Sequence, residues 1–170
     1  MAYTPPGTAG VKVDGVVPIA ASVTPAAAKI YRTGEPVVFK VNYSRVVFVN
    51  GVPQLTVSIG QSFQQAVYIG GSGTKSLSFH YLVAAGDLSV QGVVLSSTVA
   101  LNSGWIRDAV GNPARLTLPA VNTRNVLVDT VPPSVTELTI PAAATYKKGQ
   151  TLSFTVIFSE AVLVTGVPRL

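Results

Sequence analysis

The chain of 170 residues is 48% hydrophobic and only 11% charged, which excludes intrinsic disorder because disordered chains are poor in apolar residues and rich in charge. No apolar run approaches the roughly 18 residues of a membrane helix, so we expect no insertion into a membrane. The net charge of +5 is spread along the chain, whereas nucleic-acid-binding proteins usually gather basic residues in one patch, so we expect no nucleic-acid partner.

The first 13 residues contain too few apolar side chains to fold alone. They show neither the basic segment nor the apolar run of a secretory signal peptide. We expect residues 1–13 to form an arm that is either disordered or laid on a partner. The second reading is favoured, because the arm immediately precedes the first module.

Apolar and polar residues alternate over residues 37–43, which predicts a strand with one face on a core. Asn50-Gly51 favours a type I′ turn, because both residues tolerate a positive φ angle. We therefore predict a hairpin that joins residues 46–49 to residues 55–59. Pro53 has no backbone N–H, so its strand should lie at a sheet edge or carry a bulge there.

Residues 77–83 form the clearest alternating strand in the chain. Weaker strands are predicted at 93–95, 99–101, 105–106, 116–118 and 126–128. No segment shows convincing helical spacing. Short strands at regular spacing with turn residues between them predict an all-β fold, an antiparallel β-sandwich that is Ig-like in size and rhythm.

The sequence contains an internal repeat. A shift of 115 positions aligns residues 13–55 with residues 128–170 without a gap. Matched identities include Tyr31 with Tyr146, Gly34 with Gly149, and Gly51-Val52-Pro53 with Gly166-Val167-Pro168. Chance similarity seldom preserves apolar, Gly and Pro positions together over about forty residues, so the repeat outranks any local prediction.

The repeat predicts tandem Ig-like modules, the second of them incomplete. Residues 14–128 would form one sandwich, and residues 129–170 the first strands of another, with a strand at 158–164 and a turn at Thr165-Gly166. We expect the native polypeptide to continue past Leu170; the alternative is a neighbouring chain that supplies the missing strands. Pro132-Pro133 favours an extended, semi-rigid linker.

A family resemblance is carried by four segments: VDTVPPSVTELTIP, FSEAVLVTGVPRL, GSGTKSLSFHYLVAAGD and LNSGWIRDAVGNPARL. In combination they resemble the bacterial Ig-like repeats of large surface adhesins, which bacteriophage virion proteins also carry. The resemblance covers nearly everything after residue 13. It implies a non-catalytic module that serves as spacer, decoration or adhesive surface, and it implies no particular ligand.

Residues for catalysis are scarce. His80 is the sole histidine, it lies on the polar side of its strand, and no cysteine is present, so nucleophilic triads and transition-metal sites lack their parts. The seven acidic residues show no pairing suited to carboxylate catalysis. We expect no enzyme. Trp105 is interpreted as core or rim packing, because sugar-binding surfaces usually expose several aromatic residues.

Calcium is the one ion that we consider. Asp108 and Asn112 could offer oxygen ligands on a tight loop, and Asp14 and Asp129 lie at the module boundaries. The simpler interpretation is structural: Asp108 forms an Asx turn, and Gly111-Asn112 takes left-handed φ angles before the next proline. No other cofactor is expected.

Three functional hypotheses follow. The first is a structural protein of a bacteriophage particle (a fibre, decoration or tail-associated protein) that is fixed by its arm, occurs in several copies and contacts other particle proteins or a host-surface glycan or protein. The second is a fragment of a bacterial surface adhesin, located outside the cell. The third, more distant, is a carbohydrate-binding accessory module of a hydrolase.

Overall fold

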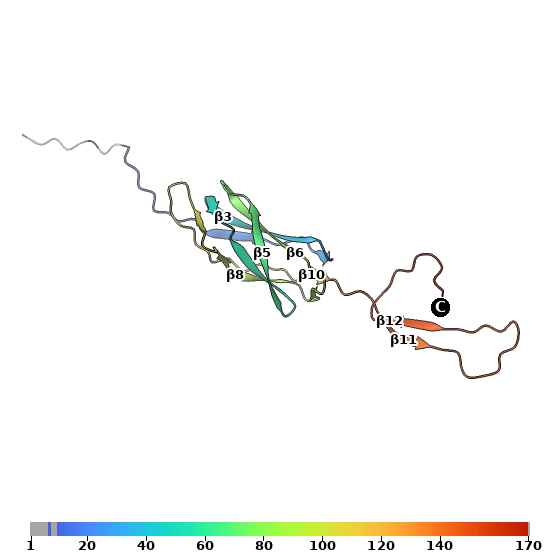
Figure 1. Ribbon diagram of the computed structural model, residues 1–170. Coiled ribbons are helices and arrows are strands. Elements are labelled where there is room, and N and C mark those ends of the chain that lie inside the picture. The colour runs from blue at the N-terminus through green and yellow to red at the C-terminus, as the bar shows by residue number, and fades with distance from the viewer. Residues whose placement is uncertain (1–6, 8–9, 170) are drawn as a thin grey trace, which may run out of the picture. The chain divides into compact units, whose positions relative to one another are not determined.

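The computed structural model describes residue 7 and residues 10–169; most of the predicted arm, residues 1–6 and 8–9, lies outside the described residues. Two compact units divide the chain, unit 1 at Met1–Thr130 and unit 2 at Val131–Leu170 (Figure 1). The described residues form strands and no helix, which confirms the predicted all-β class. This part of the chain accordingly has no helix with the length and apolar character needed to cross a membrane.

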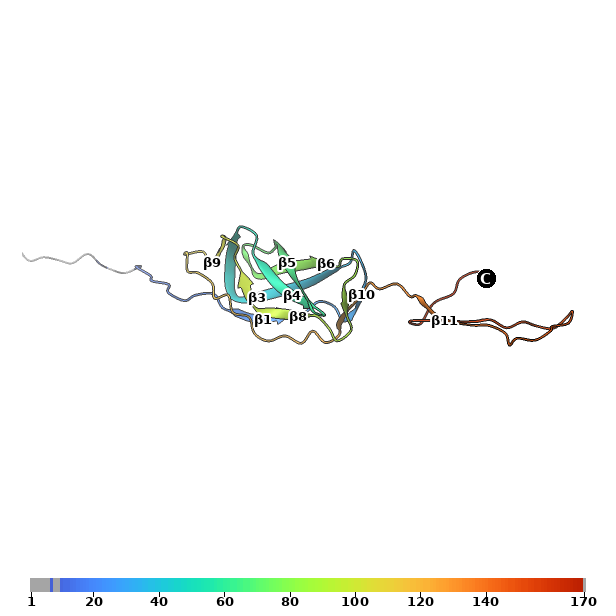
Figure 2. The same ribbon diagram turned by 60° about the horizontal axis from the view of Figure 1, so that its bottom comes forward.

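The strands of unit 1 form two sheets. The larger has the order β1-β3-β6-β5-β4-β8, with β9 added to β3, and all of its pairs are antiparallel. Its members are β1 (Ala20–Thr24), β3 (Pro36–Asn50), β4 (Gln54–Ile59), β5 (Ser62–Gly70), β6 (Thr74–Leu82), β8 (Val94–Ala100) and β9 (Trp105–Arg107). The strands of this sheet wrap around a common interior (Figure 2).

The smaller sheet has the order β2-β10-β7, with β2 at Lys29–Tyr31, β7 at Leu88–Ser89 and β10 at Val126–Asp129. β10 pairs antiparallel with β7 but parallel with β2. The sheets are antiparallel, as predicted, except at this one contact. The reason is that the chain leaves the larger sheet after β1 and joins the smaller sheet as β2.

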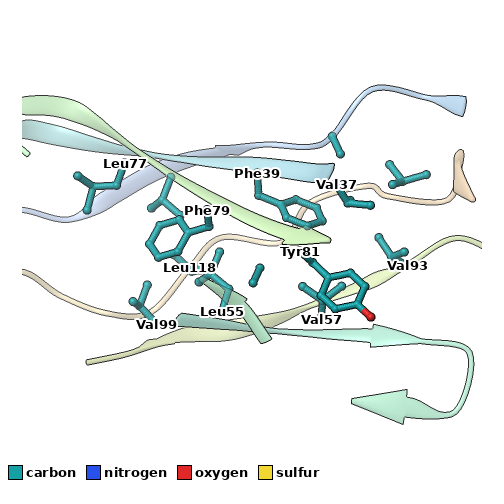
Figure 3. Close-up of a cluster of buried hydrophobic side chains, with 14 of the residues drawn as sticks. Val37, Phe39, Leu55, Val57, Leu77, Phe79, Tyr81, Val93, Val99 and Leu118 are labelled. Atoms are coloured by element: carbon teal, nitrogen blue, oxygen red, sulfur yellow. The ribbon is translucent and has the colours of Figure 1, made fainter. Parts of the chain in front are cut away.

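The interior of unit 1 is built by alternation along β3, β4 and β6, as predicted for the first and third of these strands. Every second residue of β3 from Val37 to Tyr43 is buried, and the intervening residues are half-buried or exposed. Figure 3 shows Leu77, Phe79 and Phe39 in the apolar interior, and Phe39 and Phe79 are partners across β3 and β6. This burial is the main stabilising contribution to the fold, because it removes large apolar side chains from water.

The predicted hairpin at Asn50-Gly51 is wrong. β3 and β4 do not pair with each other: the end of β3 pairs with β9, and β4 pairs with β5 and β8. Gly51 has a φ of +81°, but Asn50 lies outside the left-handed region, so the link is not a type I′ turn. It carries the chain from one part of the sheet to another.

Pro53 shows neither of the two features expected for it. Pro53 directly precedes β4, which lies between β5 and β8 and is therefore not an edge strand. The pairing of β4 with β8 shifts register between Leu55 and Val57, and not at Pro53. Pro53 lies just outside the strand, where the missing N–H removes no hydrogen bond from the ladder.

Unit 2 repeats the strand pairing of unit 1. It contains β11 (Val135–Thr139) and β12 (Thr155–Phe158), which pair antiparallel. Each residue pair of β11 and β12 lies 115 positions after a pair of β1 and β3. The pairs in unit 1 are Ala20–Tyr43, Ser22–Asn42, Val23–Val41 and Thr24–Lys40, and those in unit 2 are Val135–Phe158, Glu137–Ile157, Leu138–Val156 and Thr139–Thr155. Both ladders skip one residue at the same place. The two segments thus share one backbone register.

The hydrogen bonds outside the ladders repeat as well. The Tyr31 hydroxyl donates to the Ala27 carbonyl oxygen, and the Tyr146 hydroxyl donates to that of Ala142. Four further pairs of bonds correspond in the same way. Ser44 and Ile19 exchange two bonds, Ser44 N–H to the Ile19 carbonyl oxygen and Ile19 N–H to Ser44 Oγ, and Ser159 and Ser134 exchange the same two. Arg32 N–H donates to the Glu35 side chain and Glu35 N–H to the Arg32 carbonyl oxygen, and Lys147 and Gln150 do the same. Such agreement indicates one structural motif encoded twice.

The strand predicted at residues 158–164 is wrong. β12 ends at Phe158, and no strand follows it in the described residues, although Gly166 has the positive φ of +78° that suits the predicted turn. The matching part of β3 is held by pairing with Thr74 and with β9. The described residues of unit 2 contain no counterpart of either partner, so residues 159–164 have no strand among them with which to pair.

Tyr43 is a buried polar exception in the core of unit 1. Its hydroxyl has no hydrogen-bond partner among the described residues, and burial raises the pKa of Tyr43 to about 12. The matching residue of the repeat is Phe158, which lacks the hydroxyl. An unpaired buried hydroxyl is unfavourable, because folding removes it from water without a replacement hydrogen bond.

We expect Tyr43→Phe to raise the free energy of unfolding at pH 7 by up to about 1 kcal/mol. The pKa of Tyr43 is higher in the folded state than its unfolded value of about 10, so ionisation of this hydroxyl destabilises the fold at high pH. The stability of the parent chain is unaffected by this ionisation below pH 10 and falls as the pH rises toward 12. The variant should therefore also lose less stability at alkaline pH. Urea unfolding at pH 7 and between pH 9.5 and 11 measures both effects; a variant that is less stable at pH 7 would contradict the prediction.

Candidate functional site

The Arg45 side chain brings together three of the four residues predicted as calcium ligands. Its Nη1 atom lies 2.9 Å from Asp14 Oδ2 and 3.0 Å from Asp108 Oδ2, and it donates to the Val16 carbonyl oxygen at 2.6 Å. Asn112 Nδ2 donates to the Asp14 carbonyl oxygen and to Asp108 Oδ2, each at 3.0 Å. We call Asp14, Arg45, Asp108 and Asn112 the Arg45 cluster.

Asp108 fixes the loop of the cluster. The side chain of Asp108 is nearly buried, and its Oδ1 accepts hydrogen bonds from the backbone N–H groups of Val110 and Asn112 at 3.1 and 2.9 Å. The first of these bonds is the Asx turn considered from the sequence. Gly111 has a φ of +94°, but Asn112 does not share the left-handed conformation expected for it.

The electrostatics of the cluster favour its ionised form. Desolvation is the largest single effect on Asp108 and raises its pKa, but the hydrogen bonds from Asn112, Arg45 and Val110 together outweigh it and lower the pKa below its ordinary value. The stabilising contribution of Asp108 is therefore present above the ordinary carboxyl pKa and is lost as the pH falls through the lowered one. The hydrogen bond to Asp14 is the main cause of the raised pKa of Arg45.

The Arg45 cluster fits an ion pair better than a calcium site. Calcium takes about six to eight oxygen ligands, whereas these carboxylate oxygens already accept hydrogen bonds from Arg45 and Asn112. Within the described ranges no three acidic, His or Cys side chains gather in a group that could hold a metal. Asp129, the fourth predicted ligand, lies on β10 opposite Leu88 in the smaller sheet and does not belong to the cluster.

We expect the melting temperature of the protein to stay constant when calcium or a chelator is added, because the Arg45 guanidinium already provides the cation between Asp14 and Asp108. Thermal unfolding followed by circular dichroism measures this. Arg45→Gln is the contrasting variant: it leaves both carboxylates without their cation and should unfold at a lower temperature in every buffer. A melting temperature that rises with calcium and falls again with chelator would contradict the prediction.

Sequence reasoning missed Arg45 as the centre of the cluster. Arg45 lies 31 positions from Asp14 and 63 from Asp108, so no local motif connects them. One signal was present in the repeat, where the residue that matches Arg45 is Glu160. A reversed charge at a matched position indicates an interaction that belongs to unit 1 alone.

The opposite boundary of unit 1 is fixed by Asp87. Its Oδ2 accepts hydrogen bonds from the Tyr81 hydroxyl at 2.6 Å and from the Ala84 N–H at 2.9 Å. Desolvation, with a smaller effect from Asp87, raises the pKa of Tyr81 to about 12. The Thr130 hydroxyl donates to the Asp87 carbonyl oxygen at 2.9 Å and accepts from the Gly86 N–H. These bonds tie Thr130, the last residue of unit 1, to the turn at residues 84–87.

The remaining residues singled out in the sequence do not converge on a reactive centre. Trp105 is half-buried in β9, and the Arg107 guanidinium lies over its ring at 5.0 Å from the centroid. His80 is half-buried in β6, opposite Val38 of β3 and Val67 of β5. In the described part of unit 1, the Arg45 cluster is the largest group of charged side chains in mutual contact.

Comparisons of the chain with protein-family models, with curated proteins and with solved structures gave no match. The role of the chain must therefore be argued from its two units and from the Arg45 cluster. That cluster holds residues 14–16 against β3 and against the loop at 108–112. It thereby fixes the place at which the N-terminal arm leaves unit 1.

Proposed function

We propose that the protein is a non-catalytic structural component of a bacteriophage particle, built from tandem Ig-like β-sandwich modules and attached through its N-terminal arm. Unit 1 is one complete module in this proposal, and unit 2 begins the next. The modules act as spacers or as a displayed surface. A fibre, a decoration protein or a tail-associated protein would each fit this role.

The observation that carries the proposal is the repeated register of the two units. Two consecutive segments with the same ladder, the same irregularity and the same turn hydrogen bonds favour a modular array. In an array of domains each module has its own hydrophobic core, and length is gained by adding copies. This organisation suits a role that depends on the length of the array and on the surface that it displays, more than on a single reactive site.

The N-terminal arm supports attachment as the second element of the proposal. Its last residue, Val13, is 94% exposed, and the next residue, Asp14, is held to unit 1 by Arg45. Val11 is also exposed. Exposed apolar residues directly before a residue that is fixed to unit 1 are suited to insertion into a partner surface. Because the Arg45 cluster holds residues 14–16 to unit 1, a partner that binds the arm would also hold unit 1 in place.

Two experiments test the proposal. Immunogold electron microscopy with antibodies against unit 1 should label the outside of purified phage particles. Removal of residues 1–12, which retains Asp14 and hence the Arg45 cluster, should abolish incorporation and leave the thermal unfolding of unit 1 unchanged. Labelling of the bacterial surface in the absence of particles would favour the adhesin hypothesis instead, and full incorporation of the shortened chain would refute attachment through the arm.

A further inference from the structure

The end of β3 and the adjoining β9 carry four exposed or half-buried side chains on one face. In the ladder between these strands Phe48 lies opposite Arg107, and Asn50 lies opposite Trp105. Opposite residues, and residues two apart along a strand, point to the same side of a sheet, so these four side chains share one face. Ile106 points to the other face and is buried in the core. We call the set of Phe48, Asn50, Trp105 and Arg107 the β9 face.

A hollow of about 370 Å³ lies against the β9 face. Its lining comes from the end of β3, from β9 and from the loop that follows β9, and consists of Phe48, Trp105, Arg107, Asp108, Ala109 and Gly111. Sites for small ligands have volumes of roughly 300–1,000 Å³ and combine apolar walls with a few polar groups. The hollow therefore suits a ligand of one or two rings that carry polar substituents.

Arg107 supplies an unpaired positive charge in this hollow. Its Cζ atom lies over the Trp105 ring, 5.0 Å from the centroid, and this cation–π contact restricts the positions open to the guanidinium. Among the residues that the structure describes, no carboxylate lies within ion-pair distance of Arg107. A guanidinium presents its N–H donors in a planar fork that matches the two oxygens of a carboxylate. Arg107 is therefore suited to bind an anionic group of a ligand.

Asp108 is the carboxylate that borders the hollow, and its charge is compensated. Its Oδ2 lies 3.0 Å from Arg45 Nη1, and its Oδ1 accepts hydrogen bonds from the backbone N–H groups of Val110 and Asn112. The Asp108 side chain is also nearly buried. The uncompensated charge of the hollow is thus that of Arg107, which favours an anionic ligand over a neutral one.

We propose that the β9 face binds an acidic sugar of a polysaccharide, whose ring packs on Phe48 and whose carboxylate pairs with Arg107. Phe48 is 39% exposed, and the C–H groups on one side of a sugar ring are apolar enough to pack on an aromatic ring. Asn50, on the same face, offers its side-chain amide to the sugar hydroxyl groups. Trp105 keeps the packing role expected from the sequence, because it holds Arg107.

The structure supplies the second aromatic residue that a sugar site needs. Phe48 and Trp105 are far apart in the sequence, and the pairing of β3 with β9 brings both into the same hollow. An acidic peptide fits less well, because Asp and Glu side chains carry the charge but have no ring to cover Phe48. The proposal goes beyond the structural role proposed above and involves no residue of the arm.

The probes are tetramers of galacturonic acid and of mannuronic acid, and isothermal titration calorimetry with the full chain measures their affinity. We expect saturable binding of at least one of them. Tetramers with methyl-esterified carboxylates should bind about tenfold more weakly, because an ester cannot form the charge-assisted hydrogen bonds of a carboxylate. Trp105 is the single tryptophan, so a change in its fluorescence on binding locates the ligand at the β9 face.

Two pairs of variants separate this site from diffuse attraction to a basic protein. Arg107→Gln should weaken binding by about tenfold, whereas Arg124→Gln removes the same charge outside the hollow and should leave the affinity unchanged. Phe48→Ala should weaken binding by about fivefold, whereas Phe63→Ala removes a more exposed ring of β5 and should have no effect. All four side chains are exposed, so we expect each variant to fold, and circular dichroism verifies this.

Absence of binding by both tetramers, or an equal loss of affinity in Arg107→Gln and Arg124→Gln, would overturn the proposal. Unchanged affinity of the esterified tetramers would overturn it too. So would equal affinity for a tetraglutamate peptide, because the ligand would then be an acidic peptide. These variants leave residues 1–12 intact, so a failure here does not affect the incorporation experiment above. Failure of that experiment would equally leave this titration unaffected.

Discussion

Replacing Phe79 with alanine is expected to lower the free energy of unfolding of unit 1 by about 3–5 kcal/mol. The Phe79 side chain is completely buried, pairs directly with Phe39 across β3 and β6, and contacts the Tyr68 ring edge-on at 5.9 Å between centroids. Truncation would leave a cavity at the contact of three strands. Because small domains are stable by only about 5–15 kcal/mol, a large part of the total would be lost.

Phe63→Ala is the matched control for this experiment. Phe63 belongs to β5 in the same sheet but is 75% exposed, so its truncation should change the stability by less than about 0.5 kcal/mol. Urea unfolding followed by Trp105 fluorescence compares the two variants with the parent chain. If the two substitutions had equal effects, Phe79 would not lie in the core that the fold of unit 1 requires.

The sequence predicted strands best where every second side chain is buried in the core. Alternation in residues 37–43 and 77–83 predicted β3 and β6 because a strand with one buried face must repeat with a period of two. The 115-residue repeat was informative for the same reason. Apolar, Gly and Pro residues at matched positions preserve the buried face and the turns, and the paired strands of the two units share one register.

Partners that are distant along the chain were not predictable in this way. Asn50-Gly51 has the chemistry of a hairpin turn, but the turn alone does not determine which strands pair after it. The end of β3 pairs with β9, more than 50 positions away. The Arg45 cluster was missed for a similar reason: Asp14, Asp108 and Asn112 were each noticed, but the cation that joins them comes from β3.

The contact between the end of β3 and the start of β9 gives Gly51 and Gly104 a role that the turn prediction did not include. A Cβ atom added at Gly51 would lie 3.0 Å from the Gly104 Cα, and one added at Gly104 would lie 2.2 Å from the Asn50 carbonyl oxygen. The two glycines let the two backbone segments approach closely. A positive φ at Gly51 is thus only part of the reason for glycine there.

We expect Gly104→Ala to destabilise unit 1 by about 1–3 kcal/mol, because the methyl group meets backbone that can move only if β3 and β9 separate. Gly15→Ala is the matched control. Neither glycine has a left-handed φ, but a Cβ at Gly15 meets nothing within 4 Å, so the control isolates steric crowding from backbone strain. Urea unfolding followed by circular dichroism measures both variants. Equal stability of the two would show that β9 does not approach β3 as closely as this pairing requires.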